Sequence, residues 1–147
     1  MTDKEILEQL PYSKPFLFVD EILKIDENGV EGTFFFDGDL EFYKGHFKDN
    51  PVTPGVILTE TMAQIGLVCL GIFLLNYKLN KRKLISLTSA NIEFLKPVFP
   101  NEKVTVISEK IYFRFNKLKC NVRMLNEKNE EVCSGTISGM MVNIKQV

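Results

Sequence analysis

The sequence predicts a single α+β domain in which a curved antiparallel sheet of about five or six strands wraps around one long central helix. Residues 1–147 have the length, the 45% hydrophobic content and the 25% charged content of one globular domain. Pro54 to about Tyr77 reads as a helix that is apolar on nearly every face, and such a helix belongs in a protein core. The segments on either side of it read as strands joined mostly by short turns. A curved sheet around the helix, closed by a second copy of the chain, would bury it most completely.

The segment before the central helix predicts a short helix, a hairpin and a long loop. Pro11 ends the first helix because proline cannot continue the backbone hydrogen bonding. Asp26-Glu27-Asn28-Gly29 has the composition of a tight turn between two apolar runs. The expected elements are a helix at residues 3–10, strands at Phe16–Ile25 and Val30–Phe36, and a loop at Asp37–Thr53 that holds the only histidine.

The segment after the central helix predicts strands alone. Between Leu118 and Met124 apolar residues alternate with polar ones, the period of two that marks a half-buried strand. Pro97 and Pro100 interrupt strand pairing, and Asn126–Glu130 has turn composition. The expected elements are a basic stretch at Lys78–Lys83 and strands at Leu84–Phe94, Val104–Phe115, Leu118–Met124 and Val132–Val142.

Charge and cysteine content narrow the possible partners. The net charge of -1 gives no overall basic field that would hold nucleic acid or an anionic membrane. The three cysteines, Cys69, Cys120 and Cys133, are odd in number and far apart, and a single histidine is too few to complete a zinc site with them. We therefore expect buried, reduced thiols, no metal and no nucleic-acid partner.

Two segments concern the location of the protein. The N-terminus, MTDKEILEQL, lacks the basic start and the apolar core of a signal peptide, which predicts a cytoplasmic protein. The apolar run Ile65–Leu75 has 11 residues, whereas a membrane span needs roughly 20. We therefore expect a core helix and no membrane span.

The predicted start of the central helix, Thr53-Pro54-Gly55-Val56, could bind a negative charge. Thr is a good N-cap, and Pro suits the first helical position. The amides of Gly55 and Val56 then have no carbonyl partner inside the helix and lie at the positive end of its dipole. Gly55 has no side chain, so a substrate carbonyl could approach its amide closely. The segment therefore fits an oxyanion site, although these four residues alone are more typical of a helix that is simply well capped.

Glu60 lies on the second turn of this helix among the apolar residues Val56–Leu58 and Met62. A carboxylate in apolar surroundings is costly to ionise, so we expect a raised pKa and a proton donor near neutral pH. Gln64 follows four residues later on the same face, where its amide can reach a neighbouring polar group. The alternative is a structural Glu60 that pairs with a buried lysine or caps a strand end.

His46 lies in the loop that delivers the chain to the helix, in the segment Tyr43-Lys44-Gly45-His46-Phe47. Histidine is the usual side chain for proton transfer at physiological pH. Gly45 frees the backbone, Phe47 is expected to anchor the loop in the core, and prolines stiffen the return to the helix. The loop is thus predicted to hold the imidazole still, although a lone loop histidine is more often a solvated residue.

Three motifs surround the predicted helix start in one collinear order, namely Gly45-His46-Phe47, Asn50 to Val56 (NPVTPGV) and Glu60 to Gln64 (ETMAQ). Two further stretches agree, namely Leu10-Pro11 with Pro15–Asp20, and Phe94–Val98 with Pro100–Glu102. Together these motifs resemble the bacterial β-hydroxyacyl-acyl-carrier-protein dehydratases, the FabZ/FabA family, over roughly the whole chain.

The resemblance implies a hotdog fold, a homo-oligomer (a dimer or a trimer of dimers) and a 3-hydroxyacyl substrate bound to acyl carrier protein. It implies that His46 of one subunit removes the α-proton and Glu60 of the other protonates the departing hydroxyl, without a metal or an organic cofactor. The amide of Gly55 would stabilise the enolate oxygen, with Val56 and Gln64 also at the substrate. A Glu at position 60, not an Asp, resembles the branch that dehydrates without isomerising the double bond.

Two departures from the family pattern concern the pathway. The chain has Tyr12-Ser13 where the family usually has a His-Arg pair, and Lys48-Asp49-Asn50 where it often has a second histidine. These changes border the site and spare its acid–base pair, so they favour a specialised pathway, such as lipid or polyene synthesis, over housekeeping fatty-acid elongation. Two other functions stay open on the same fold, namely an acyl thioesterase and a non-catalytic subunit that binds acyl chains.

Overall fold

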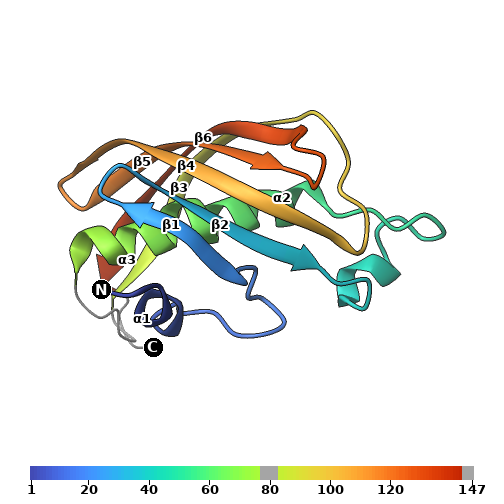
Figure 1. The fold of residues 1–147 in the computed structure, drawn as a ribbon, viewed down its shortest axis with the longest axis horizontal. Coiled ribbons are helices and arrows are strands. Elements are labelled where there is room, and N and C mark those ends of the chain that lie inside the picture. The colour runs from blue at the N-terminus through green and yellow to red at the C-terminus, as the bar shows by residue number, and fades with distance from the viewer. Residues whose placement is uncertain (77–82, 144–147) are drawn as a thin grey trace.

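A six-stranded antiparallel sheet curves around one central helical rod in the computed structural model of the chain (Figure 1). The structure describes residues 1–76 and 83–143. The strands follow the order β1-β2-β4-β5-β6-β3, so β1 and β3 are the two edges of the sheet. The elements are α1 (Asp3–Glu8), β1 (Glu21–Asp26), β2 (Gly29–Phe36), η1 (Glu41–Lys44), α2 (Gly55–Ala63), η2 (Gln64–Cys69), α3 (Leu70–Leu75), β3 (Lys83–Phe94), β4 (Glu102–Arg114), β5 (Lys117–Leu125) and β6 (Glu131–Asn143). The predicted α+β architecture is confirmed.

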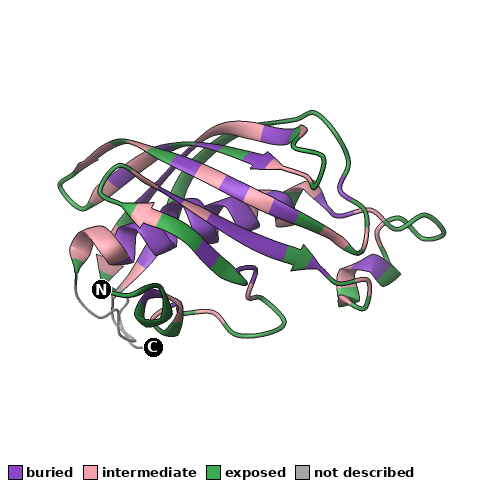
Figure 2. Ribbon diagram, viewed as in Figure 1, coloured by how far each residue is buried: buried purple, intermediate pink, exposed green. Residues whose placement is uncertain are grey.

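The central helix is continuous from Gly55 to Leu75 and consists of α2, the π-helical η2 and α3. It has 21 residues, with a mean hydropathy of 1.8, so its length and composition alone would allow a membrane span. The 11-residue run Ile65–Leu75 therefore underestimates its length. However, 72% of its most apolar part is buried, and Figure 2 shows these buried turns beneath the sheet. Burial, and not length, identifies it as the core helix of a globular domain.

The middle of the central helix lies against β4 and β5 at Gly66. A Cβ atom on Gly66 would lie 3.0 Å from the side chains of both Ser108 and Val122, so glycine allows this close approach without a shift of its neighbours. The Ser108 hydroxyl donates a hydrogen bond of 2.8 Å to the Gly66 carbonyl, within the π-helical turns of η2. This bond satisfies a backbone carbonyl of η2 and fixes the helix on the sheet.

The segment before β1 differs from the prediction. Phe16–Asp20 was expected to be part of the first strand, but β1 begins only at Glu21. The Phe16 carbonyl accepts a hydrogen bond of 3.0 Å from Nε2 of Gln64. The Phe18 N–H donates a hydrogen bond of 2.8 Å to Oε1 of Gln64. A helix side chain therefore takes the place of a neighbouring strand, which local sequence cannot show.

The strands predicted after the helix are confirmed, with ends within two residues of the expected ones. The predicted helix end at Tyr77 and most of the basic stretch Lys78–Lys83 lie outside the described residues; Lys83 begins β3. Phe36, the last residue of β2, pairs with Glu102 at the start of β4, and from this end of the sheet the chain enters the loop that holds the histidine. As predicted, the three cysteines are free and buried: Cys69, Cys120 and Cys133.

Candidate active site

The loop between β2 and α2 holds His46 through backbone and ring hydrogen bonds. The His46 N–H donates to the Phe42 carbonyl (3.1 Å), and the Val52 N–H donates to the His46 carbonyl (2.9 Å). The ring Nδ1 lies 3.0 Å from the Val52 carbonyl oxygen. Because a carbonyl oxygen only accepts, Nδ1 carries the proton in this bond, and Nε2 of the neutral ring keeps a free lone pair. This tautomer suits a base that acts through Nε2.

His46 borders an open hollow of about 350 Å³ at the start of α2. Gly55 and Leu58 line the hollow from the helix, and Phe94–Pro97 line it from the segment at the end of β3. A Cβ atom on Gly55 would lie 3.2 Å from the Phe94 ring, tighter than an ordinary contact. The missing side chain of Gly55 therefore lets the Phe94 ring approach the helix start closely.

The helix start differs from the prediction in its cap. Pro54 is the N-cap residue and Gly55 the first residue of α2, and the cap has no side-chain hydrogen bond. The Thr53 hydroxyl, which was predicted to cap the helix, lies 2.5 Å from the hydroxyl of Tyr43. The capping prediction was wrong because the helix begins one residue later than expected and a buried tyrosine binds the threonine hydroxyl.

The first two amides of α2 precede its hydrogen-bonded turns. The first helical donor is the N–H of Ile57, which bonds to the Pro54 carbonyl (2.9 Å). The amides of Gly55 and Val56 come before it, at the positive end of the helix dipole. Gly55 lines the hollow beside His46, whereas the side chain of Val56 is 76% exposed. An oxyanion role for these amides stays a prediction, and Gly55 is the better placed of the two.

Glu60 is half-buried elsewhere on α2, and Gln64 holds its carboxyl group. The Nε2 of Gln64 donates to Oε2 of Glu60 (2.9 Å) and to the Phe16 carbonyl (3.0 Å). Its Oε1 accepts from the Phe18 N–H (2.8 Å). The polar atoms of the fully buried Gln64 are thus directed at the protein. Its predicted contact with substrate stays a prediction, and its observed contacts are with Glu60 and the backbone of Phe16 and Phe18.

Burial raises the pKa of Glu60 above its ordinary value, although the hydrogen bond from Gln64 opposes this shift. The predicted direction of the shift is confirmed, and it keeps Glu60 uncharged to a higher pH. Tyr12 lies close enough to be affected: burial first, then the Glu60 carboxylate and the Cys69 thiol, raise the pKa of its phenol. The sequence marked Tyr12 only as a departure from the family pattern and did not place it beside Glu60.

His46 and Glu60 have different surroundings within one chain. Glu60 follows Gly55 by five residues, a rotation of roughly 140° around an α-helix. Gly55 faces the hollow beside His46, whereas Glu60 faces Gln64 and the segment before β1. In the described part of a single chain, the predicted acid–base pair is therefore not brought together.

Exposed apolar side chains surround the hollow. Phe47 is 60% exposed, and Phe94 and Leu95 are 51% and 53% exposed. The prediction that Phe47 anchors the loop in the core was wrong: its ring stacks on the His46 ring, with centroids 4.3 Å apart. A monomeric protein rarely leaves such a group of apolar side chains in water, so this surface indicates contact with another molecule.

Comparison with known proteins decides the family, because residues 10–132 match the FabA-like domain. The chain belongs to the FabA-like family. Its relatives include two 3-hydroxyacyl-[acyl-carrier-protein] dehydratases named FabZ. The one from Acinetobacter baylyi is 28% identical over 148 residues, which cover 100% of this chain and 92% of the relative. The one from Sinorhizobium medicae is 31% identical over 148 residues, which cover 98% of this chain and 92% of the relative.

Solved structures similar to this FabA-like chain include thioesterases. A mutant thioesterase from Pseudomonas aeruginosa has a TM-score of 0.68 at 12% identity, covering 98% of this chain and 96% of the other. A thioesterase from Haemophilus influenzae has a TM-score of 0.61 at 21% identity, covering 86% and 80%. Such low identities show the fold alone, which confirms the hotdog fold. The chain is therefore FabZ-like in sequence and shares only its fold with the thioesterases.

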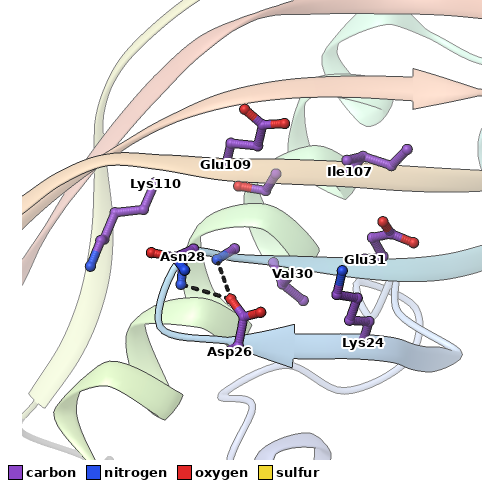
Figure 3. Close-up of a pocket in the computed structure, with 10 residues that line it drawn as sticks. Lys24, Asp26, Asn28, Val30, Glu31, Ile107, Glu109 and Lys110 are labelled. Carbon is purple, nitrogen blue, oxygen red and sulfur yellow. Dashed lines mark hydrogen bonds between the residues drawn. The ribbon is translucent and has the colours of Figure 1, made fainter.

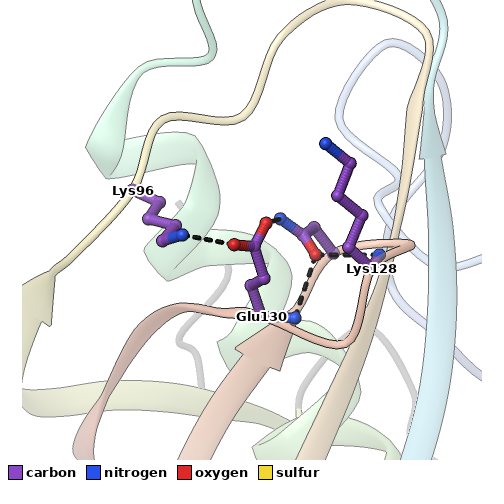
Figure 4. A network of polar contacts seen from close by, with 4 residues as sticks. Lys96, Lys128 and Glu130 are labelled. Atoms are coloured by element: carbon purple, nitrogen blue, oxygen red, sulfur yellow. Dashed lines mark hydrogen bonds and ion pairs between the residues drawn. The ribbon is translucent and has the colours of Figure 1, made fainter.

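Lys96, at the edge of the hollow in this FabA-like chain, is fixed by an ion pair (Figure 4). Its Nζ contacts Oε2 of Glu130, whose Oε1 accepts a hydrogen bond of 3.0 Å from the Asn126 side chain. Lys96, first among several causes, lowers the pKa of Glu130. The pair ties the segment after β3 to the turn between β5 and β6, so it supports one wall of the hollow.

A second hollow of the FabA-like chain lies at the β1–β2 hairpin (Figure 3), away from both predicted catalytic residues. Oδ1 of Asp26 accepts hydrogen bonds from the N–H groups of Asn28 (2.8 Å) and Gly29 (3.1 Å), which stabilise the hairpin turn. Within residues 1–76 and 83–143, His, Cys, Asp and Glu side chains form no group of three that could hold a metal ion. The lining of this hollow carries charges of both signs, from Lys24, Asp26, Glu31, Glu109 and Lys110.

Proposed function

We propose that this FabZ-like chain removes water from a 3-hydroxyacyl thioester on acyl carrier protein and forms the trans-2-enoyl thioester, in fatty-acid synthesis or a related lipid or polyene pathway. The observation that carries the proposal is the 3.0 Å hydrogen bond between Nδ1 of His46 and the Val52 carbonyl, which leaves Nε2 as a base beside the start of α2. The FabZ relatives support the reaction type and the carrier-bound substrate.

His46 and Glu60 handle the two protons of the elimination. Nε2 of the neutral His46 takes the proton from C2, and the electron pair of that C–H bond forms the double bond between C2 and C3. The bond from C3 to the hydroxyl oxygen breaks, and the uncharged Glu60 gives its proton to this oxygen, which leaves as water. His46 then releases a proton to solvent and Glu60 regains one. Each such proton transfer contributes roughly 10²–10⁴ to the rate, and neither needs a metal or an organic cofactor.

Gly55 stabilises the charge that develops between these two steps. As C2 loses its proton, negative charge moves to the thioester oxygen. The amide of Gly55 lies at the positive end of α2 and in the same hollow as His46, and it donates to this oxygen. An oxyanion donor of this kind contributes roughly 10²–10³ to the rate.

Two copies of the chain share each site, with His46 from one and Glu60 from the other. Three observations support this. The two residues have different surroundings in one chain. The strand β3 is an edge of the sheet, free to pair with a second copy. The side chains of Phe47, Phe94 and Leu95 are exposed around the hollow beside His46, where a partner subunit would bury them. The assembly is a homodimer or a trimer of such dimers.

The proposal is tested with purified chain and a panel of carrier-bound 3-hydroxyacyl substrates, with the products identified by mass spectrometry. The wild-type protein should convert them by loss of one water. His46→Ala and Glu60→Gln should each lower kcat by at least about 100-fold while the fold and oligomer persist. Glu31→Gln, the same change on β2 at the second hollow, serves as the matched control and should leave kcat unchanged. Near-normal rates in both site variants would overturn the assignment.

The same experiment separates the alternatives. A thioesterase would release free thiol from saturated acyl thioesters as well as from 3-hydroxyacyl ones. A non-catalytic subunit would show no turnover until another chain is added. We place the reaction in the cytoplasm, supported by three buried free cysteines that suit a reducing compartment.

A further inference from the structure

The loop that carries His46 is closed at its base by two buried hydroxyl groups. Tyr43 and Thr53 are 5% and 4% exposed, and their hydroxyl oxygens lie 2.5 Å apart. The two residues are ten positions apart in the chain, with His46 between them. The hydrogen bond therefore joins the part of the loop before His46 to the part after it.

This closure lies next to the contacts that set the His46 ring. Thr53 directly follows Val52, whose carbonyl accepts from Nδ1 of His46 and whose N–H donates to the His46 carbonyl. The Thr53 N–H donates to the carbonyl of the fully buried Val98 (2.9 Å), so the Thr53 backbone is anchored in the core. Tyr43 thus holds the loop at Thr53, the residue whose amide nitrogen is bonded to the Val52 carbonyl carbon.

A hydroxyl pair in this place has a property that an apolar pair of the same shape lacks. Two buried hydroxyls lose their hydration, a loss that their mutual hydrogen bond must offset. In return the bond is directional and fixes how the two ends of the loop lie against each other. Burial raises the pKa of Tyr43 above its ordinary value, so the phenol stays protonated and the bond persists at neutral pH.

We propose that the Tyr43–Thr53 hydroxyl pair positions the catalytic base: it holds the Val52 carbonyl against Nδ1 of His46 and so keeps the proton on Nδ1 and the lone pair on Nε2. Thr53 lines the hollow beside His46, but its hydroxyl is bound to Tyr43, so the pair acts through His46 as positioning residues. The inference rests on the proposed role of His46, but its test reads the ring directly.

The test uses Tyr43→Phe, Thr53→Val and the double variant, each labelled with ¹⁵N-histidine. The chain has one histidine, so long-range ¹H–¹⁵N spectra report the tautomer of His46 without overlap. The neutral wild-type ring should be the Nδ1–H tautomer alone. Each single variant should show a mixture with the Nε2–H tautomer, and kcat for a carrier-bound 3-hydroxyacyl substrate should fall about tenfold with KM little changed. The double variant should be no worse than either single one, because both remove the same bond.

Two further variants separate positioning from stability. Thr53→Ser keeps a hydroxyl and should retain the Nδ1–H tautomer. Tyr112→Phe is the matched control. Tyr112 lies under Arg114 at the C-terminal end of β4, whereas the other end of β4 pairs with Phe36 next to the loop. It should leave both spectrum and kcat unchanged. Folded variants of Tyr43 and Thr53 with an unmixed Nδ1–H tautomer would overturn the inference. Full turnover by His46→Ala would instead overturn the proposed function, whatever the spectra show.

Discussion

The side-chain amide of Gln64 donates a hydrogen bond of 2.9 Å to Oε2 of Glu60 and, with its remaining contacts, holds the backbone of Phe16 and Phe18. One buried side chain therefore links the proposed acid to the segment that precedes β1. The bond favours the charged form of Glu60, whereas burial opposes it, and burial is the larger of the two effects on the pKa of Glu60.

Replacing Gln64 by leucine should affect both stability and the pH profile. Gln64→Leu leaves the Phe18 N–H and the Phe16 carbonyl without their partner, which should lower the free energy of unfolding by about 2–4 kcal/mol. Loss of the bond to Glu60 should raise the pKa of Glu60 further, so the alkaline fall of kcat should move to higher pH. Urea unfolding at one protein concentration and a pH–rate profile measure the two effects.

Gln9→Leu is the matched control for the stability effect. Oε1 of Gln9 is buried with no hydrogen-bond partner among the described residues, so this change should not destabilise the protein.

Glu60 should also make the stability of the protein depend on pH. Burial raises the folded-state pKa of Glu60 above the ordinary value of an unfolded glutamate, about 4.3. Between these two values the folded state binds more protons than the unfolded state, so stability falls as the pH rises through this window. Glu60→Gln cannot ionise and should lack this fall. Its free energy of unfolding, relative to wild type, should therefore increase with pH across the window. Parallel stability curves for the two proteins would contradict the raised pKa.

Inactive variants should restore each other if each site is shared. A heterodimer of His46→Ala and Glu60→Gln subunits has one site with both changes and one intact site. Co-expression at equal levels makes about half of the dimers mixed, so specific activity should reach about a quarter of the wild-type value. Each variant alone should be nearly inactive. Co-expression of His46→Ala with the double variant His46→Ala/Glu60→Gln contains no intact site and should restore nothing. Absence of recovery in the first pair would show that the pair acts within one chain.

The sequence predicted the fold well where periodicity carries the information. The alternation from Leu118 to Met124 predicts β5 within a residue at each end, because the strand is buried on one face. Local patterns failed where tertiary contacts decide. Phe16–Asp20 is apolar like a strand but bonds to Gln64, a residue more than forty positions away in the chain. The π-helical turns of η2 also bond to a distant residue, Ser108 on β4, which no helical pattern shows.

The side chains of the candidate site were predictable one by one, whereas the contacts that hold its loop were not. The raised pKa of Glu60 follows from its apolar neighbours, and the sequence shows these directly. The family resemblance alone predicted that His46 and Glu60 belong to different subunits, which agrees with their separation within one chain. The partner of Thr53 follows from the path of the loop. This path depends on how the chain folds back, so the sequence predicted the chemistry of the side chains and missed the closure of the loop by Tyr43.

The turn between β4 and β5 should tolerate, and gain from, a change at Phe115. Phe115 and Asn116 both have left-handed backbones, with φ of 51° and 60°, the pattern of a type I′ hairpin turn. This conformation suits Asn and is strained for a bulky residue, and the Phe115 side chain is 91% exposed, so it gains little from packing. Phe115→Asn should therefore raise the free energy of unfolding by about 0.5–1 kcal/mol, a gain of roughly 1–4 °C in Tm for a domain of this size. Thermal and urea unfolding at one protein concentration measure this gain in stability.

Phe99→Asn is the control. It removes a 44% exposed phenyl ring from a residue without a left-handed backbone, so it should give no such gain. A loss of stability in Phe115→Asn would show that the ring makes contacts worth more than the strain.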